Sequence, residues 1–436
     1  MNHSYKFNPP AVAQIQDILT ELWPICRSIT GQGYRQSLDI LSRIMPMEQL
    51  VFKTGESVFD WKIPVEWNIT EAFISDESGK IIVDFKNNNL HVVNYSEPVD
   101  KKISREELEP YLHSLPEFPT WIPYRTSYYK PTWGFCVQDT LKSKMNDKFY
   151  NVKINSSLSD GQLVVGEKIL KSKNHQAQDI LISTYLCHPS MGNNELSGPI
   201  VTAFLYQALC QIPDLKFNYR FIVCPETIGA IAYLSKREKE LKEKVMTGFV
   251  VTCCGNPGKI TVKKTKAGDH LLDRVIKNVV EHFKNGDQIS FRDYFPYGSD
   301  ERQYSSPGFD FNVSSICRSM YGDYPEYHTS ADDLNFITTS ALIESIELHV
   351  RAIFVLEKNI CPIRTNPHCE PMLSKYDLVS TMGGHKTLQH DRKLISYLCA
   401  YADGKNDLLR IAEIAEESFV DIYEMYVVLK RNKIFV

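Results

Sequence analysis

The chain has 436 residues, more than one hydrophobic core usually serves, so its length predicts two or three structural units. Hydrophobic residues make up 43% of the sequence and charged residues 23%, a balance that excludes a disordered or fibrous protein. The formal net charge of -4 provides no overall attraction to a phosphate backbone or to anionic lipid, which argues against nucleic acid as a partner.

Two features predict a cytoplasmic protein without a membrane partner. No apolar stretch approaches the roughly 18 residues that a spanning helix needs, and the polar residues 1–6 lack the apolar region of a signal peptide. The 11 cysteines are odd in number and irregularly spaced, which favours a reducing compartment. Cys253 and Cys254 follow an apolar run, which predicts buried thiols, although a metal-ligand role for one of them stays open.

The first predicted elements are two helices. Apolar residues recur at spacings of three and four from Val12 to Leu22, the stripe of an amphipathic helix, and the pattern ends near Pro24. The same period returns over residues 34–44. The chain therefore begins with a helical pair.

The period changes to that of β strands between about residues 59 and 95. Val65, Trp67 and Ile69 alternate with polar residues, and further short apolar runs follow between turn-rich segments. Residues 76–80 and 87–89 are the expected turns, because glycine and asparagine tolerate positive φ. This stretch predicts a small β unit, followed by an extended, proline-rich connection.

Between about residues 150 and 360, apolar runs alternate with helical patterns, which predicts an α/β sheet layered with helices. The runs lie at residues 180–186, 219–223, 248–251 and 311–313. The polar residues of interest follow the ends of such runs, where open α/β sheets place their ligands.

The segment after Pro371 is predicted to be an independent winged helix. Its helical stripes and its short apolar end lie at residues 394–401, 408–415, 422–429 and 434–436. The expected recognition helix begins with Asp421 and Glu424, which would repel phosphate. We therefore expect a protein partner for this unit in preference to DNA.

The first candidate site segment contains His188, which follows the run at residues 180–186. Asn194 and Glu195 come next, before a helical stretch that starts at Ser197-Gly198. A histidine at the carboxyl edge of a sheet is well placed to offer its imidazole to a metal. A helix-capping or core histidine is the alternative.

Two further segments complete the candidate site. Glu226 follows the run at residues 219–223, where apolar neighbours would raise the pKa of its carboxyl group toward that of a general base. Taken alone, it is equally an acidic residue near a helix start. His328 could bind a metal through one ring nitrogen while a carboxylate holds the other, with Asp300 and Asp332 nearby in the sequence.

Substrate contacts are expected from arginines and aromatic residues. An arginine would grip a carboxylate or phosphate, and aromatic rings would line the pocket, although surface ion pairs and core packing are the alternatives. The candidates are Arg27, Arg125, Arg302, Tyr128, Tyr129 and Trp133.

In their order, these segments resemble the co-catalytic zinc aminopeptidases, the family that also includes the glutaminyl cyclases. The resemblance implies a zinc ligand at His188, a bridging position at Asn194, a catalytic base at Glu226, a late ligand at His328, and supporting acidic residues at Asp300 and Asp332. Three acidic ligands of the family are missing, since Asn194, Thr227 and a residue near Thr252-Cys253 take their places.

These departures argue against a two-zinc centre. A neutral amide is a poor bridge between two dications, and Glu195 would substitute only if the loop is shifted. The expected cofactor is therefore one zinc ion or none.

A closer resemblance covers nearly the whole chain, to the bacterial aminopeptidase-like proteins often described with polysaccharide biosynthesis. It rests on phrases such as Arg27-Ser28-Ile29-Thr30-Gly31, Phe59-Asp60-Trp61-Lys62-Ile63-Pro64, Trp133-Gly134-Phe135-Cys136 and Ser299-Asp300-Glu301-Arg302. The resemblance implies an aminopeptidase-like α/β domain at residues 1–59 and 130–364, an inserted β-rich domain at 60–129, and a winged helix at 365–436.

The leading hypothesis is metal-assisted hydrolysis of an amide bond in a small peptide-like substrate. Zinc held by His188 and His328 would acidify a water molecule, and Glu226 would accept its proton and pass it to the leaving amine. The rival hypothesis is a binding or scaffold protein that keeps the fold without the chemistry, with a link to polysaccharide biosynthesis. A regulator that binds DNA is a third hypothesis, and it predicts steeply salt-dependent binding to duplex.

Overall fold

The computed structural model describes residues 5–283, 288–376, 378 and 386–436, with the backbone alone for residues 386–389. The described residues divide into two compact units. The core unit comprises Pro9–Gly268 and Ser290–Ile346, and the C-terminal unit comprises Met1–Asn8, Asp269–Ile289 and Glu347–Val436. The three-domain boundaries expected from the sequence stay a prediction, because this division follows spatial contacts and not chain order.

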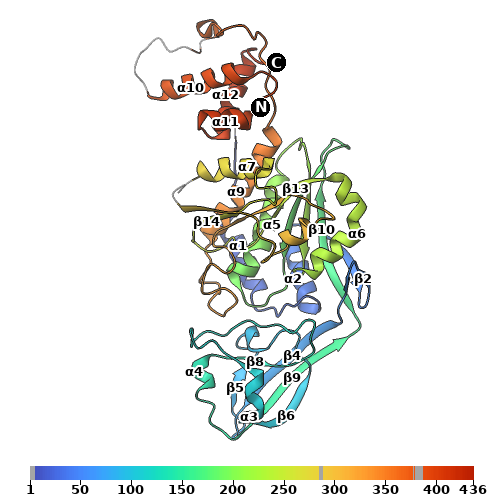
Figure 1. Cartoon of the computed structure of the whole chain (residues 1–436). Helices are drawn as coiled ribbons and strands as arrows, with labels where there is room; N and C mark the ends of the chain where they lie inside the picture. The colour runs from blue at the N-terminus through green and yellow to red at the C-terminus, as the bar shows by residue number, and fades with distance from the viewer. Residues whose placement is uncertain (1–4, 284–287, 377, 379–385) are drawn as a thin grey trace. The chain divides into compact units, whose positions relative to one another are not determined.

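A mixed sheet, with eight strands among the described residues, forms the centre of the core unit (Figure 1). In spatial order the strands are β1 (Glu48–Lys53), β10 (Gln162–Leu170), β12 (Asn218–Cys224), β11 (Asp179–Tyr185), β13 (Val245–Val250), β16 (Val313–Cys317), β14 (Ile260–Lys263) and β15 (Ile289–Arg292). β12, β11, β13 and β16 run parallel, whereas β1, β10 and β14 pair antiparallel with their neighbours. β11, β12 and β13 overlap the predicted apolar runs at residues 180–186, 219–223 and 248–251, whereas the run at residues 311–313 ends where β16 begins. The carboxyl ends of the four parallel strands share one edge of the sheet.

The helices of the core unit include both predicted N-terminal helices. They are α1 (Val12–Leu22), α2 (Gln32–Ser42), the π-helical turn η3 (Gly192–Leu196), α5 (Ser197–Leu209), α6 (Ile228–Lys244) and α8 (Glu301–Tyr304), and α9 (Thr339–Lys358) spans the boundary between the units. The predicted stripe of α1 is buried at Ile15, Ile18, Leu19 and Leu22. Helix α5 is buried over most of its length because its sequence is apolar on several faces.

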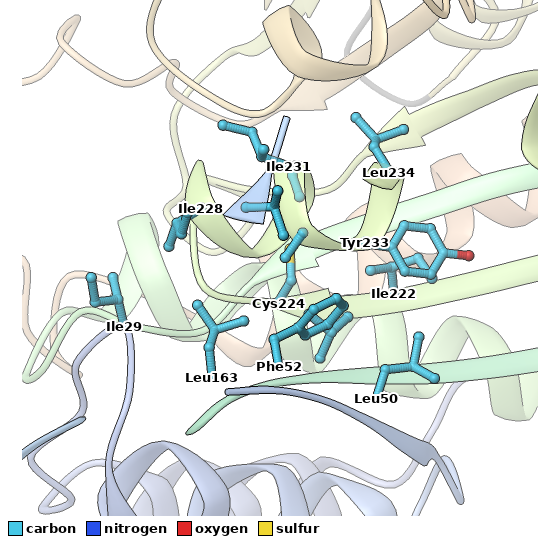
Figure 2. Close-up of a cluster of buried hydrophobic side chains, with 14 of the residues drawn as sticks. Ile29, Leu50, Phe52, Leu163, Ile222, Cys224, Ile228, Ile231, Tyr233 and Leu234 are labelled. Atoms are coloured by element: carbon cyan, nitrogen blue, oxygen red, sulfur yellow. The ribbon is translucent and has the colours of Figure 1, made fainter. Parts of the chain in front are cut away.

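Helix α6 covers one face of the sheet with its first half (Figure 2). Ile228, Ile231 and Leu234 belong to the same buried cluster as Phe52 and Leu163 of the sheet. None of these side chains is more than 7% exposed, and burying each one contributes about 1.5–3 kcal/mol. The start of α6 is thereby held against the sheet, which fixes the residues that immediately precede the helix.

The β-rich part of the core unit is built on a smaller sheet, with four strands among the described residues in the order β5-β4-β9-β6. Its strands are β4 (Glu66–Ser75), β5 (Ile81–Asp84), β6 (Val99–Ser104) and β9 (Phe149–Ser159). β4 and β9 pair antiparallel along their length and lie side by side in Figure 1. The predicted turn at residues 76–80 joins β4 to β5, closed by the hydrogen bond from the Asp76 N–H to the Lys80 carbonyl (3.0 Å). β9 comes from residues beyond 129, so this sheet recruits a strand from outside the expected insertion.

Short elements complete the β-rich part and its connections. They are β2 (Ser57–Val58), β3 (Trp61–Lys62), η1 (Asn89–His91), α3 (Arg105–Leu108), η2 (Glu109–Tyr111), β7 (Leu112–His113), β8 (Phe135–Cys136) and α4 (Asp139–Lys142). Three of them are stabilised locally: β2 and β3 form a hairpin, and Ser104 and Glu107 form a capping box at the start of α3. β7 pairs parallel with β8, which brings residues 112–113 beside residues 135–136.

The C-terminal unit contains the predicted winged helix. Its elements are α7 (Leu271–Glu281), η5 (Leu373–Tyr376), α10 (Lys386–Tyr401), α11 (Leu408–Ala415) and α12 (Phe419–Arg431). Asp407 and Ser418 cap α11 and α12 by accepting hydrogen bonds from backbone N–H groups of the first helical turn. In the described part of the chain, no helix is both long and apolar enough to cross a bilayer.

Candidate metal and catalytic site

The candidate site lies where the central parallel strands end. β11 and β12 pair in register up to Tyr185 and Cys224, and the Leu186 N–H continues the ladder to the Cys224 carbonyl (3.0 Å). The two chain segments therefore leave the sheet together. His188 Nε2 and Glu226 Oε2 come to lie 3.6 Å apart.

Glu195 sets the orientation of the His188 ring. One carboxylate oxygen of Glu195 is 2.6 Å from His188 Nδ1, and the other accepts the backbone N–H of Cys187. The carboxylate thus holds the ring nitrogen opposite the one that faces Glu226. This is the position of a carboxylate that orients a metal-binding histidine, so the geometry suits Glu195 to a supporting role more than to metal contact. Beneath the loop, the buried Arg27 donates from Nε to the His188 carbonyl (3.2 Å).

Burial and neighbouring charges shift the pKa values of both His188 and Glu226. Burial lowers the pKa of His188, but the charge and hydrogen bond of Glu195 outweigh it, and the pKa is raised from its ordinary value. Burial raises the pKa of Glu226 to about 7, although the neighbouring His188 acts in the opposite direction. A carboxyl group that titrates near neutral pH can both accept and donate a proton.

The backbone beside Glu226 is strained and tied down. Thr227 has a φ of 64°, a conformation that is costly for a β-branched residue, on the order of 1–3 kcal/mol. Its N–H donates to Asp300 Oδ1 (2.8 Å), and its hydroxyl accepts from Arg302 Nη2 (2.8 Å). Burial, followed by the charge of Glu226, raises the pKa of Asp300 well above its ordinary value. Asp300 and Arg302 thus brace the residue next to the candidate base.

Asp332 supports the loop that carries the predicted bridging position. Its carboxylate accepts the N–H groups of Asn193 (2.6 Å) and Asn194 (2.9 Å), both in the η3 turn. Despite these bonds, burial raises the pKa of Asp332 to about 6. Asp332 therefore holds the backbone of η3, whereas the sequence alone suggested a carboxylate on the His328 ring.

The amide of Asn194 leaves one buried acceptor unused. Its Nδ2 lies 3.4 Å from the Tyr185 hydroxyl, whereas its Oδ1 has no hydrogen-bond partner among the residues described. The side chain is 1% exposed, and buried oxygens without a partner are rare. An amide oxygen in this state fits a bound cation, which would supply the missing partner.

His328 reaches the site from a distant loop. Its ring stacks on Tyr327 with centroids 3.9 Å apart, and its centroid lies 5.5 Å from that of His188. Burial and the nearby His188 lower the pKa of His328 to about 3, which keeps the imidazole neutral and able to bind a metal. Across the described residues, its side chain forms no hydrogen bond, so both ring nitrogens are free for a ligand.

The predicted substrate residues lie in different places. Tyr128 is hydrogen bonded to Tyr124 (2.8 Å between hydroxyl oxygens), and Tyr124 lies edge-on to His188 at 5.0 Å. Arg302 lies near Glu226 because its Nη2 donates to the hydroxyl of the next residue, Thr227. The buried Nε of Arg302 has no partner in the described part of the chain. Arg125 is exposed and contacts His113, away from Glu226.

The other three candidate substrate residues, Arg27, Trp133 and Tyr129, make packing or backbone contacts. Arg27 is fully buried and binds backbone carbonyl groups, including that of Leu22 (2.7 Å). Trp133 stacks on Tyr111 in the β-rich part, with centroids 3.9 Å apart. Tyr129 is 55% exposed and contacts Trp61 edge-on. Of these three residues, Arg27 contacts the His188 carbonyl, and the contacts given for Trp133 and Tyr129 involve none of His188, Glu226 and His328.

Cys187 is a site residue that the sequence analysis did not single out. Its sulfur lies 3.5 Å from His188 Nδ1 and accepts the backbone N–H of Glu226 (3.3 Å). Cys187, His188 and Glu195 present ligand atoms within 4.8 Å of one another. However, burial raises the pKa of the Cys187 thiol well above its ordinary value, and Glu195 is already engaged. The only sequence signal for Cys187 was its place immediately before His188.

The side chains near this edge of the sheet include donor types that zinc accepts, whereas acidic ligands expected for a second ion are missing from the sequence. His188 Nε2, the His328 ring, Asn194 Oδ1 and Glu226 offer nitrogen and oxygen atoms of the kind that zinc accepts. Where a second ion would need a carboxylate after β13, the chain has Thr252, whose hydroxyl lies 2.6 Å from that of Tyr185, and the buried Cys253.

The mixed sheet, the histidines and glutamate at its carboxyl edge, the β-rich insertion and the terminal winged helix define an aminopeptidase-like α/β protein. Residues 16–359 match the family described as a domain of unknown function, DUF4910, and residues 361–436 match a winged helix-turn-helix family. The chain belongs to the DUF4910 family.

Relatives from Clostridium acetobutylicum cover nearly the whole chain. A protein named for polysaccharide biosynthesis and an aminopeptidase-like domain is 42% identical over 399 residues, 92% of this chain and 90% of the relative. A crystal structure from the same species, described as a peptidase, has a TM-score of 0.90 at 40% identity and covers 98% of this chain and 96% of that chain.

Zinc aminopeptidases share the fold at low identity. A zinc aminopeptidase from Bacillus subtilis has a TM-score of 0.57 at 14% identity, covering 80% of this chain and 96% of that chain. An M28 peptidase precursor from Shewanella amazonensis has a TM-score of 0.56 at 12% identity, covering 79% and 92%. At these identities the similarity establishes the fold alone.

Proposed function

We propose that this protein is a zinc-dependent hydrolase that cleaves an amide or peptide bond in a small substrate. The observation that carries the proposal is the pairing of His188 Nε2 with Glu226 at 3.6 Å, while Glu195 holds Nδ1 at 2.6 Å. The ring therefore offers one nitrogen to a ligand, directly beside a carboxyl group suited to proton transfer.

Four residues would hold the metal or move the proton. His188, His328 and the orphaned Asn194 Oδ1 supply the candidate ligands. When bound, zinc supplies Lewis acidity, which polarises the scissile carbonyl and acidifies a water molecule. Glu226 would accept a proton from a water molecule beside its carboxyl group and deliver it to the leaving amine, since its pKa of about 7 would allow both transfers.

The surrounding residues keep Glu226 in place. Asp300 holds the Thr227 N–H, and Arg302 holds the Thr227 hydroxyl, so the backbone at the catalytic carboxyl group has little freedom to shift. The buried Nε of Arg302, which has no partner among the described residues, would be the candidate donor to a substrate oxygen beside Glu226. Tyr128, linked through Tyr124 to the histidine pair, would border the substrate on the other side.

Other properties of the proposal rest on the relatives and on composition. The relative named for polysaccharide biosynthesis supports a role in that process, and the aminopeptidase-like neighbours support a peptide-like substrate. All 11 cysteines are free, which supports a cytoplasmic location. For the C-terminal unit we propose a protein partner, because Asp421 lies in the first turn of α12, the expected recognition helix. Binding of duplex DNA at low salt would contradict that partner.

Elemental analysis and an activity assay test the hydrolase proposal together. Protein purified without added metal is expected to contain one zinc ion per chain and to hydrolyse aminoacyl 4-nitroanilides. The Glu226→Gln variant should keep its zinc and lose activity by about 100-fold or more. Glu243→Gln, an exposed glutamate of α6, is the matched control and should behave as the wild type. Absence of both zinc and activity from the wild type would overturn the proposal.

A binding or scaffold function is the second candidate, favoured by one specific observation. The resemblance to two-metal aminopeptidases implies carboxylates where this chain has Asn194, Thr227 and a residue near Thr252-Cys253, and the Thr252 hydroxyl is 2.6 Å from that of Tyr185, so a ligand could be held here without turnover. Zinc present at full occupancy, with no turnover of any anilide by wild type or Glu226→Gln, would favour this second function.

A further inference from the structure

A cavity borders the candidate site on the side of His328. It has a volume of about 620 Å³, within the usual range for small-molecule sites. The residues that the argument uses are His113, Tyr124, Arg125, Asp139, Lys142 and His328, all of which line it. Because Tyr124 and His328 also face His188, at centroid distances of 5.0 and 5.5 Å, the cavity and the candidate site share a wall.

Backbone hydrogen bonds hold this wall together. The Tyr124 N–H donates to the His328 carbonyl (2.8 Å), and the Ser330 N–H donates to the Ile122 carbonyl (2.9 Å). The Ile122 N–H donates in turn to the Ser330 hydroxyl (2.9 Å), and Pro123 and Thr329 form an isolated bridge. Arg125, the next residue along, is therefore fixed relative to His328 by the segment that precedes it.

Arg125 is the unneutralised cation of this cavity. Its side chain contacts His113 Nδ1 at 3.0 Å, and in the described ranges it makes no ion pair with a carboxylate. Burial, together with Arg125 and Lys142, lowers the pKa of His113 to about 4, so the imidazole is a neutral acceptor that positions the guanidinium without cancelling its charge.

Two other charged groups of the cavity, Lys142 and Asp139, have partners of their own, and Glu117 also lines the cavity. Lys142 is paired with Glu109 at 2.6 Å and donates to the Leu112 carbonyl at 3.3 Å. Asp139 accepts a hydrogen bond from the Ser114 hydroxyl at 2.7 Å. Among the described residues, neither Asp139 nor Glu117 forms an ion pair with Arg125, so the planar donors of Arg125, which match a carboxylate, are still available to an anion from a ligand.

We propose that this cavity is a substrate subsite in which Arg125 binds a free carboxylate, so that the substrate is a short peptide or amide with an acidic end. A carboxylate is favoured over phosphate because Asp139 and Glu117 also line the cavity and would repel a dianion more strongly than a monoanion. The subsite deepens the proposed hydrolase function, since a ligand that fills the cavity reaches His328 at its inner wall.

Calorimetric titration of the full chain as purified tests the subsite without requiring turnover. The probes are L-alanyl-L-alanine and L-alanyl-L-alaninamide, which differ only in the terminal carboxylate, with inorganic phosphate as a third titrant. Chromatography of each mixture reports whether the probe was cleaved. The variants are Arg125→Gln and, as a matched control, Arg43→Gln, an exposed arginine paired with Glu21 at 2.8 Å.

The wild type and Arg43→Gln should bind the free acid at least about tenfold more tightly than the amide, the effect of one charge-assisted pair, and Arg125→Gln should lose that preference. An equal preference in Arg125→Gln, or none in the wild type, would overturn the proposal, as would tighter binding of phosphate than of the peptide. Preference without cleavage of either probe would support the subsite and count against the hydrolase proposal alone.

Discussion

Replacing Arg220 by methionine should destabilise the core unit strongly while leaving the candidate site intact. The Arg220 side chain is 1% exposed and binds Glu167 at 2.6 Å and Asp179 at 2.7 Å, and those carboxylates are themselves only 2% and 1% exposed. Arg220 also contacts Glu240 (2.6 Å) and the Tyr233 hydroxyl (3.2 Å). Methionine keeps much of the volume but leaves two buried carboxylates without their central counter-charge.

The magnitude follows from this geometry. Removing one partner of a buried ion pair costs about 3–5 kcal/mol, because the other charge stays buried. Arg237 still binds Glu167 at 2.5 Å, and Asn218 still donates to Asp179 at 2.8 Å, so the loss should lie within that range and not above it. Such a loss is a large share of the roughly 5–15 kcal/mol that stabilises a typical domain.

Urea unfolding followed by tryptophan fluorescence measures the effect in the right unit, since all 5 tryptophans lie within Pro9–Gly268. Arg43→Met, which removes an exposed pair, is the control and should cost less than about 1 kcal/mol. In a double-mutant cycle, Asp179→Asn should recover part of the loss in Arg220→Met. A loss in Arg220→Met no greater than that of the control would refute the reasoning, and so would a loss of bound zinc at unchanged stability.

Three further perturbations test other parts of the structure. Glu195→Gln should weaken zinc binding by about 10–100-fold, measured by competition with a chelator, because the His188 ring loses its charged support; unchanged affinity would contradict the orienting role. Gly192→Ala should lower the unfolding temperature, since a Cβ there would lie 2.6 Å from the Asp333 carbonyl oxygen, whereas Gly308→Ala meets no atom within 4 Å and serves as control. The pKa of His113 is about 4 in the folded chain and near its ordinary value of 6.5 in the unfolded chain. Between these pH values the unfolded state binds more protons, so the free energy of unfolding should fall as the pH drops through that window. In the His113→Gln variant, the free energy of unfolding should fall less over the same pH window, as measured by urea titrations at several pH values. A pH dependence identical to that of the wild type would contradict the assignment.

The local patterns of the sequence correctly predicted the elements that need no distant partner. The stripe from Ile15 to Leu22 lies in α1, and the run at residues 180–186 matches β11 to within one residue at each end, because side-chain periodicity and burial are properties of a short segment. The approach of His188 to Glu226 also followed from the sequence, since adjacent parallel strands must end at the same sheet edge.

Distant pairings were beyond the local patterns. β9 pairs with β4 although the two strands are separated by more than 70 residues, and no local period indicates which strand a segment will join. For the same reason Asp332 was expected near His328, whereas its carboxylate holds the backbone of η3. Glu195, a candidate ligand from the sequence, lies on the Nδ1 side of His188, and its contact with a metal stays a prediction.

The sequence by itself determined the aminopeptidase-like class of the protein, its winged-helix end and the residue types available at the carboxyl edge of the sheet. These depend on segment patterns and on which side chains the chain contains. Only the tertiary structure decided which nitrogen of His188 faces away from Glu195 and that the Asn194 amide oxygen has no partner among the described residues. It also decided that Arg125 and His328 line the same cavity. Orientation and charge balance are set by groups brought together from remote parts of the chain, and one-dimensional spacing does not record those distances.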